Sequence, residues 1–426
     1  MVRTLLAVLA CALVAAQAQA ETLYVRAGRL VDPVEGAAGA DRRIKIVDGR
    51  IAEVAPWTAP PADAAVLDWS RYTVLPGLID LHTHVADGFG QTDDPAEALK
   101  HSEGETALKG AEAARTMLRA GFTTVRDVGA YRGLSDVTLR DAIAAGWVEG
   151  PRMLVAGAYI TKPGGGGAVT GAAKGTVIPA VFRLGEARTP AEARTRVRAL
   201  IGGGADFIKI IASGAVLAVG SEPGALELDE PTIKAACDEA QALGKYCIAH
   251  AHGAEAIKAA IRAGARTIEH ASLIDDEGIA VAKARGVWLD MDIYNGDWIE
   301  AVGTQERWPA EYLRKNRETT DAQREGFRKA VAAGAKLTFG TDAAVYPYGL
   351  GARQFAYMVR FGMTPAQAIR SATTEAAAAL RMERELGRVE PGFAGDLVAV
   401  DGDPLTDVRV LERVAGVVKG GKPVRR

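Results

Sequence analysis

Residues 75–84 read LPGLIDLHTH. An apolar run that ends in two histidines two residues apart indicates a buried strand whose last polar side chains, His82 and His84, face the same side. Three more of the six histidines also end short apolar runs: His250, His252 and His270. Because parallel α/β barrels carry their active sites at the carboxyl ends of the strands, this pattern predicts one site shared by several strands.

A repeated pattern follows the opening strand: an Ala-rich stretch, a glycine and a short apolar run. The seven glycines are Gly121, Gly146, Gly204, Gly244, Gly264, Gly286 and Gly334. A glycine just past a helix takes the left-handed conformation that other residues resist. Seven units after one opening strand give eight strands alternating with helices. The pattern therefore predicts an α/β chain with a (β/α)8 TIM-like barrel over residues 77–387.

The two ends of the chain read as β structure. Residues 21–76 contain strand-like runs with a hairpin signal at Asp48-Gly49, and residues 388–426 contain further runs. We expect both ends to form one small β-sandwich domain beside the barrel. The alternative is two unrelated strand extensions.

Residues 1–20 resemble an export signal. Arg3 precedes an apolar run over 5–16 that is too short to span a bilayer, and 18–20 read AQA, a small-x-small cleavage site. The mature chain would then begin at Glu21 and be periplasmic or secreted. An ordinary N-terminal helix and a lipoprotein anchored at Cys11 are the alternatives.

Composition excludes several classes of protein. Hydrophobic residues make up 48% and charged residues 24% of the chain, which suits a packed core rather than disorder. The formal net charge of −2 gives no reason to expect nucleic acid, or a membrane after signal cleavage, as a partner. After cleavage, Cys237 and Cys247 remain, which are too few for a disulfide framework.

Two further polar residues lie on predicted strands. Asp342 ends the eighth strand, and Lys209 lies within the fourth between two isoleucines. A lone histidine is usually a satisfied structural residue, as we expect for His101, but five at equivalent strand ends favour ligands. Imidazole with carboxylate suits zinc and similar ions. A buried lysine is costly unless it is modified or paired, here with Asp342.

With these residues in place, the chain resembles the amidohydrolase superfamily over nearly the whole mature sequence. The 75–84 motif is similar to the opening motif of these enzymes, and the lysine, histidines and aspartate complete it. Four segments resemble the branch of Xaa-Pro dipeptidases, imidazolonepropionase-like proteins and ochratoxinase-type metal-dependent carboxypeptidases: 207–213, 249–254, 268–272 and 340–346.

The resemblance implies two divalent metal ions, with zinc expected. One ion would be bound by His82, His84 and Asp342, the other by His250 and His270, and a carboxylated Lys209 would bridge them. A hydroxide between the ions would attack the substrate, and Asp342 would pass its proton to the leaving nitrogen. His252 would touch the substrate carbonyl or carboxylate, although strand spacing alone does not separate His250 from His252 as the ligand. Relatives are often octamers, so a homo-oligomer is expected.

Two segments depart from the resemblance where substrate would lie. Residues 163–167 read PGGGG, where many relatives carry Gly-Gly-His, and Tyr348 stands where many have histidine. The glycine run lacks the Lys-Ser/Thr of a phosphate loop and is expected to form a flexible flap. Arg183 and Arg188 are candidates for binding a substrate carboxylate, although both also suit an exposed surface.

Three functions remain open at this point. The first is hydrolysis of a small-molecule amide next to a free carboxylate, in dipeptides, N-acyl amino acids or aromatic amides such as ochratoxin. The second is hydrolysis of cyclic amides or lactones by the same metals. The third is a non-catalytic exported binding protein, which the complete ligand set argues against.

Overall fold

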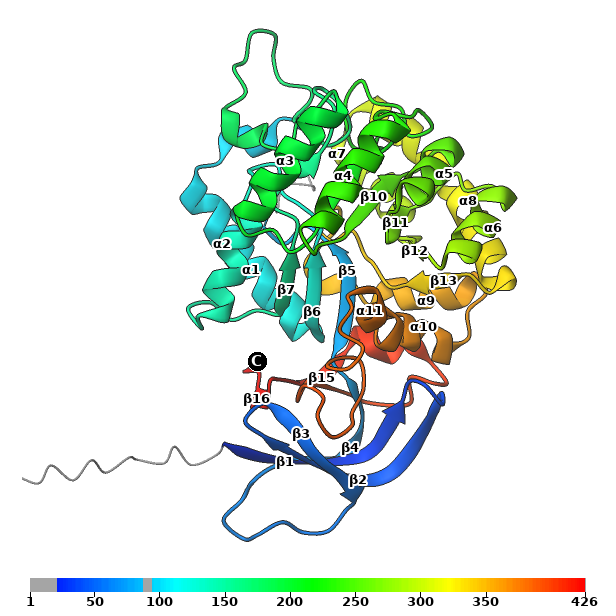
Figure 1. Ribbon diagram of the computed structural model, residues 1–426. Helices are drawn as coiled ribbons and strands as arrows, with labels where there is room; N and C mark the ends of the chain where they lie inside the picture. The colour runs from blue at the N-terminus through cyan, green and yellow to red at the C-terminus, as the bar shows by residue number, and fades with distance from the viewer. Residues whose placement is uncertain (1–20, 87–93, 426) are drawn as a thin grey trace, which may run out of the picture.

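The computed structural model describes residues 21–86 and 94–425, and it places a parallel α/β body on a mixed β sheet (Figure 1). The expected export signal at 1–20 lies outside the described residues. Within the described ranges, no helix is both long and apolar enough to cross a membrane.

The body contains every one of the eight expected strands and one short additional strand, β8. Their bounds are β5 (Leu78–Thr83), β6 (Phe122–Asp127), β7 (Arg152–Val155), β8 (Tyr159–Ile160), β9 (Ile208–Ile211), β10 (Cys247–Ala251), β11 (Thr267–His270), β12 (Trp288–Asp290) and β13 (Lys336–Thr338). They form two parallel sheets, in the orders β5-β6-β7 and β8-β9-β10-β11-β12-β13.

Hydrogen bonds connect the edges of the two sheets without forming a ladder. The Leu81 amide donates to Phe339 O at 2.9 Å, and the Asp342 amide donates to His82 O at 2.8 Å. Strand β5 therefore lies beside the chain that follows β13, which brings the first and last strands of the body together.

Helices connect the strands and surround them (Figure 1). Their bounds are α1 (Glu103–Arg119), α2 (Ser135–Ala144), α3 (Pro190–Gly202), α4 (Glu230–Ala242), α5 (Ala254–Ala263), α6 (Asp276–Arg285), α7 (Asn295–Glu306), α8 (Ala310–Ala333), α9 (Arg353–Arg360), α10 (Pro365–Ser371) and α11 (Thr374–Ala379). All seven repeat glycines follow a helix and have φ between 66° and 106°. The sequence pattern is confirmed because only glycine adopts this conformation without strain.

The chain ends share one sheet, seen as the blue and red strands in the lower half of Figure 1. It comprises β1 (Thr22–Asp32), β2 (Ala37–Val47), β3 (Arg50–Pro56), β4 (Ala65–Pro76), β14 (Leu397–Val400), β15 (Val414–Lys419) and β16 (Lys422–Pro423). The strands follow one continuous order, β16-β15-β14-β4-β1-β2-β3. The expected sandwich of two sheets is therefore a single hydrogen-bonded sheet, because β4 pairs with both β1 and β14. Val25, Ile44, Trp69 and Leu397 lie in its buried core.

A disulfide joins the two cysteines that the sequence analysis had judged too few for a framework. Cys237 on α4 is bonded to Cys247 at the start of β10, with Cα atoms 5.2 Å apart. The bond connects a covering helix to the strand that carries two of the histidines. The spacing of ten residues along the chain gave no signal of this contact.

Candidate metal centre

Five histidines from three strands meet at one end of the body. Their ring centroids are 4.7 Å apart for His82 and His270, 4.6 Å for His250 and His270, and 4.7 Å for His252 and His270. His84 lies 5.6 Å from His82. All five rings line a cavity of about 190 Å³ together with Lys209 and Asp342. The structure therefore brings together the six strand-end residues and the strand residue Lys209 that the sequence had singled out.

The backbone is strained at two of these positions. His270 has φ of 67° and Asp342 has φ of 55°, in the left-handed region that non-glycine residues avoid. Such strain persists where surrounding structure fixes the residue, and it is concentrated at functional sites. His270 ends β11 and Asp342 follows the end of β13 by four residues, and both side chains line the cavity.

The donor atoms fall into two groups that share His270. One group comprises His82, His270 and Asp342, and the other comprises His250, His252 and His270; within each group the ligand atoms lie within 4.8 Å of one another. Asp342 Oδ1 is 3.4 Å from His82 Nε2 and 3.2 Å from His84 Nε2. Imidazole nitrogens and a carboxylate at this spacing could hold divalent metal ions of the zinc type.

A neighbouring acceptor is hydrogen-bonded to one ring nitrogen of four of the histidines, whereas Glu269 lies at ion-pair distance from His82 Nδ1 without hydrogen-bond geometry. The pairs are His82 Nδ1 with Glu269 Oε2 (3.0 Å), His84 Nδ1 with Gly129 O (2.9 Å), His250 Nε2 with Gly214 O (3.1 Å), His252 Nδ1 with Ser272 Oγ (2.7 Å) and His270 Nδ1 with Asp292 Oδ1 (3.0 Å). The second nitrogen of each ring is then left for a ligand. Acceptors of this kind set the tautomer and orientation of metal-binding histidines.

Burial sets the charge state of the site in the metal-free protein. It lowers the pKa of His82, His250 and His252 well below the ordinary value, so these rings are neutral, as metal binding requires. For His84 and His270, burial is outweighed by the carboxylates of Asp342 and Asp292 respectively, so the pKa of each ring is raised. Burial also lowers the pKa of Lys209 to about 8. For Asp342 burial acts in the opposite direction, but the hydrogen bond from His84 and nearby positive charges lower its pKa overall.

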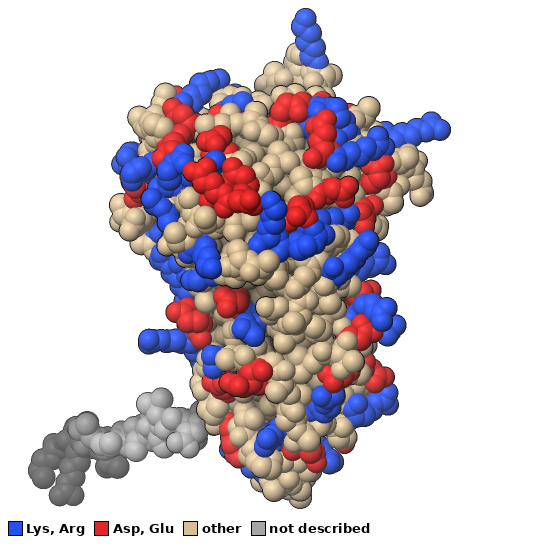
Figure 2. All heavy atoms as spheres, turned by 90° about the vertical axis from the view of Figure 1, so that its right-hand side faces the viewer, with Lys and Arg blue, Asp and Glu red and all other residues tan. Residues whose placement is uncertain are grey.

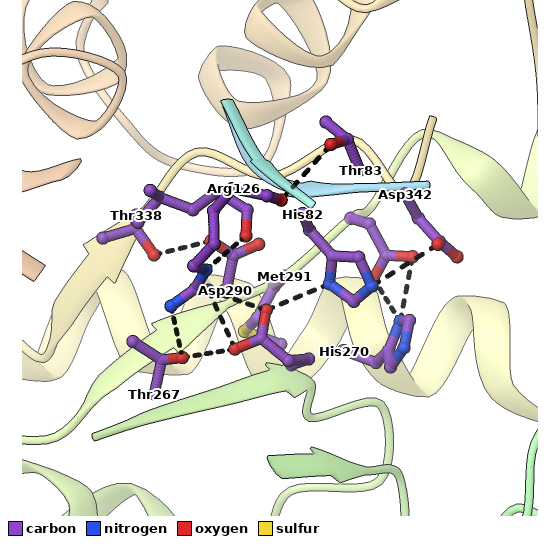
Figure 3. Close-up of polar contacts among 12 residues, drawn as sticks. His82, Thr83, Arg126, Thr267, His270, Asp290, Met291, Thr338 and Asp342 are labelled. Atoms are coloured by element: carbon purple, nitrogen blue, oxygen red, sulfur yellow. Dashed lines mark hydrogen bonds and ion pairs between the residues drawn. The ribbon is translucent and has the colours of Figure 1, made fainter. Parts of the chain in front are cut away.

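A buried ion pair lies directly behind His82 (Figure 3). Arg126 is fully buried and donates to both carboxylate oxygens of Glu269 at 3.0 and 3.1 Å. It also donates to Leu81 O at 2.7 Å and to Thr267 Oγ1 at 3.1 Å. A buried ion pair with its donors satisfied in this way fixes the carboxylate that faces His82 Nδ1.

Removing the negative charge of Glu269 is expected to destabilise the protein strongly. Glu269→Gln leaves Arg126 buried without a counter-charge, which costs about 3–5 kcal/mol of unfolding free energy. Urea unfolding of the metal-free protein measures this cost. The matched control is Glu300→Gln, which breaks an exposed pair with Arg317 and should cost about 1 kcal/mol or less. Equal losses in the two variants would contradict the role given to the buried pair.

Asp290 and Gly340 form the tightest contact beneath the site. Asp290 is fully buried, accepts a hydrogen bond from Thr338 Oγ1 at 2.8 Å, and has its pKa raised well above the ordinary value by burial and then by Glu269. A Cβ at position 340 would lie 1.7 Å from Asp290 Oδ1 and 2.8 Å from His82 Cβ. Only glycine therefore fits between them.

Gly340→Ala is expected to lower the unfolding free energy by at least about 1–3 kcal/mol, because the added methyl group must displace Asp290 or His82. Denaturant unfolding measures the loss. Gly202→Ala serves as the control, since a Cβ there meets nothing within 4 Å and the residue ends helix α3. That change should be neutral or stabilising by up to about 1 kcal/mol. A neutral Gly340→Ala would show that the contact is not tight.

The structure leaves other expected residues outside the cavity lining. Arg183 is half exposed and pairs with Glu186 at 2.9 Å, and Arg188 is exposed. Tyr348 donates from its hydroxyl to His84 O at 3.1 Å, so it supports the strand end rather than lining the cavity. His101 pairs with Glu97, as expected of a structural residue. These loop positions were not fixed by the strand pattern.

The cavity lining carries several carboxylates and few positive charges. Among the described residues that line it, Lys209 is the only lysine or arginine. Besides Asp94, which pairs with Lys100, the rest of the wall combines neutral polar side chains with apolar ones: Tyr131, Tyr312, Asn316, Thr319, Thr320, Val216, Leu217, Ile299 and Val345. The glycine run contributes Gly166 and Gly167, both buried, and the Gly166 amide donates to Glu227 at 2.8 Å. Gly165, Gly166 and Gly167 are therefore packed into the wall while Gly164 is exposed, and the flexible flap stays a prediction.

The sequence did not lead to the residues that lie behind the histidines, Lys209 and Asp342. Arg126 and Glu269 read as ordinary strand residues, and Asp292 and Asn295 follow β12, where no histidine drew attention. The rule that polar residues at strand ends face the site applies equally to β12. Applied there, it would have found Asp292.

Comparisons with known proteins agree with this geometry. The family described as "Amidohydrolase family" matches residues 73–424. The ochratoxinase of Aspergillus niger is 28% identical, over 96% of this chain and 88% of its own length. The structure of a Xaa-Pro dipeptidase with bound methionine in its active site superposes with a TM-score of 0.89 at 33% identity, covering 95% of this chain and all of that one. Phenylurea hydrolase B gives a TM-score of 0.77 at 26% identity, covering 95% and 97% of the two chains.

Proposed function

The chain belongs to the amidohydrolase family of metal-dependent hydrolases of amide and peptide bonds, and from that premise we propose that it binds two metal ions and cleaves an amide next to a free carboxylate. The observation that carries the proposal is the convergence of five histidines, Lys209 and Asp342 on one cavity. A non-catalytic binding role would not require so complete a donor set.

The donor set divides between two ions. His82, His84 and Asp342 would hold the first through the two Nε2 atoms and Oδ1. His250 and His270 would hold the second through Nδ1 and Nε2, the ring nitrogens that Gly214 and Asp292 leave free. Two bound divalent ions of the zinc type would polarise the substrate carbonyl and lower the pKa of water to roughly 7.

Lys209 would link the two ligand groups as a carboxylated side chain. Its side chain is buried and lines the same cavity as the five histidines and Asp342, which supports this role. A pKa of about 8 leaves a fraction of the amine neutral at physiological pH. The neutral amine is the form that attacks carbon dioxide, and the resulting carbamate replaces a buried cation by an anionic ligand.

Asp342 would handle the proton of the reaction. Its Oδ1 faces His82 and His84, while its Oδ2 is held by Asn295. The lowered pKa keeps the carboxylate ionised before reaction, so it can accept a proton from the attacking water and return it to the leaving nitrogen. His252, with Nδ1 fixed by Ser272, would present Nε2 to the substrate carbonyl or carboxylate.

The substrate carboxylate would meet neutral donors and the electropositive metal pair, since Arg183 lies outside the lining. Tyr131, Tyr312 and Asn316 are among the neutral polar side chains of the cavity lining. The Xaa-Pro dipeptidase and ochratoxinase relatives support an amide substrate. The second candidate function is hydrolysis of an uncharged substrate: an amide, urea, cyclic amide or lactone. Two observations favour it: Lys209 is the only lysine or arginine among the described lining residues, and phenylurea hydrolase B is a structural relative.

A hydrolysis screen of the zinc-loaded protein tests the proposal. It compares N-acyl amino acids and dipeptides with their carboxamide derivatives, and with lactones and cyclic amides. We expect kcat/KM to fall when the carboxylate is converted to the amide. A higher kcat/KM for the neutral derivatives would select the second candidate, and turnover of none of them would reject both.

Location, assembly and barrel closure complete the proposal. The disulfide between Cys237 and Cys247 supports an oxidising compartment, the periplasm or the exterior, in agreement with the signal-like residues 1–20. We propose that the two parallel sheets close into one eight-stranded barrel, as the bonds from β5 to the chain after β13 suggest. A homo-oligomer remains part of the proposal.

A further inference from the structure

Asn295 occupies a position between the two halves of the metal centre. It begins helix α7, is 6% exposed and lines the cavity. Its Nδ2 lies 2.6 Å from Asp292 Oδ2 and 3.3 Å from Asp342 Oδ2. One side-chain amide thus contacts both the carboxylate that orients His270 and the carboxylate that faces His82 and His84.

The chemistry of the neighbours fixes the orientation of this amide. An ionised carboxylate only accepts hydrogen bonds, whereas Nδ2 carries two hydrogens and Oδ1 carries none. The reversed amide would place Oδ1 against two acceptors. Asn295 therefore donates one hydrogen to each carboxylate.

Each carboxylate is in turn held on its other side. Asp292 receives His270 Nδ1 at 3.0 and 3.1 Å and Gln323 Nε2 at 2.9 Å. Asp342 has Oδ1 directed at His82 and His84, so Asn295 is the donor that holds the remaining oxygen, Oδ2. Among the contacts of the described residues, this amide directly connects the two carboxylates.

We propose that Asn295 is a positioning residue that holds the Asp342 carboxylate and, through Asp292, the His270 ring in the geometry that binds both metal ions. The inference rests on the proposed function, because it assumes that these side chains bind metal. Without the amide, two carboxylates face each other with no donor between them. They would repel each other and rotate, so metal affinity falls together with the rate.

The competing explanation is that Asn295 only fills space at the start of α7. Two variants separate the explanations. Asn295→Asp keeps the shape but replaces the donor by a third acceptor, whereas Asn295→Ala removes both the shape and the donor. A donor role predicts that Asp is worse than Ala; a space-filling role predicts the reverse order.

The experiment measures zinc affinity by equilibrium dialysis against chelator buffers, with metal analysis of the full-length protein, and compares the visible spectra of the cobalt-loaded forms. We expect Asn295→Ala to weaken zinc binding about 10- to 100-fold and Asn295→Asp to weaken it further. The cobalt spectrum should change in both variants, because the ligands reorient. Thr373→Val is the control: this buried residue does not line the cavity and its hydroxyl bonds to carbonyl oxygens of helix α10, so zinc affinity should stay within about twofold.

Circular dichroism and thermal melting of the metal-free forms show whether each variant folds. If Asn295→Asp does not fold, the zinc affinity of Asn295→Ala alone tests the inference. Zinc affinity of Asn295→Ala within twofold of the parent, or an Asp variant that binds better than the Ala variant, would overturn the inference. In both cases the parent protein binds zinc and hydrolyses amides, so the proposed function stands. A parent protein that binds no zinc would overturn both.

Discussion

Replacing Asp342 by asparagine is expected to reduce kcat by at least about 10³-fold while the protein stays folded. General acid–base catalysis increases a reaction rate by about 10²–10⁴-fold, and the variant also loses an anionic metal ligand. The amide keeps the shape of the carboxylate, and its oxygen can take the place of Oδ2 and accept the hydrogen bond from Asn295. The loss should therefore appear in kcat and not in the melting temperature of the metal-free form.

Steady-state kinetics on the best substrate of the screen measure this effect, with metal content determined on the same samples. The control is Asp321→Asn, which removes a carboxylate that is 98% exposed on helix α8 and should leave kcat unchanged. If Asp342→Asn with two bound ions kept near-normal activity, Asp342 would not be the proton-handling group.

Replacing Lys209 by methionine is expected to have opposite effects on metal binding and on the stability of the metal-free protein. The variant cannot be carboxylated, so the two ions lose their shared ligand; metal content should fall below two per chain and kcat/KM by about 10²–10⁴-fold. Methionine has a similar length and carries no charge, so it removes the cost of a buried ammonium group. The metal-free variant should therefore be at least as stable as the parent.

The pH dependence of stability gives this prediction a clear sign. The pKa of Lys209 is about 8 in the folded metal-free protein and 10.5 ordinarily. Between these values the unfolded chain binds more protons than the folded one, so this group makes stability rise with pH over that window. Denaturant unfolding at several pH values should show a shallower rise for Lys209→Met. An unchanged slope, or a metal-free variant less stable than the parent, would contradict the account of Lys209 as a costly functional residue.

The histidines, Lys209 and Asp342 of the site could be predicted from the sequence because two local rules determine their positions. The repeat glycines mark helix ends, so the strands after them could be located within a few residues. The direction of a parallel strand then assigns its last polar side chains, such as His82, His250 and His270, to one edge. These inferences need only periodicity and direction, which neighbouring residues in the sequence determine.

The supporting residues could not be found in the same way. Arg126 and Glu269 meet across 143 positions of sequence, and an arginine within a strand carries no local sign of its partner. Arg183 lies outside the cavity lining because the long loop between β8 and α3 decides its position. The single sheet formed by the chain ends depends on β4 pairing with strands from both termini. Pairings across such distances are set by tertiary packing, which no short pattern encodes.

Crystallography of the zinc-loaded protein with anomalous scattering at the zinc edge tests the binuclear centre most directly. We expect two anomalous peaks in the cavity, one beside His82, His84 and Asp342 and the other beside His250 and His270, with density for a carbon dioxide adduct on the Lys209 amine between them. A single peak, or an unmodified Lys209 that contacts neither ion, would contradict the account.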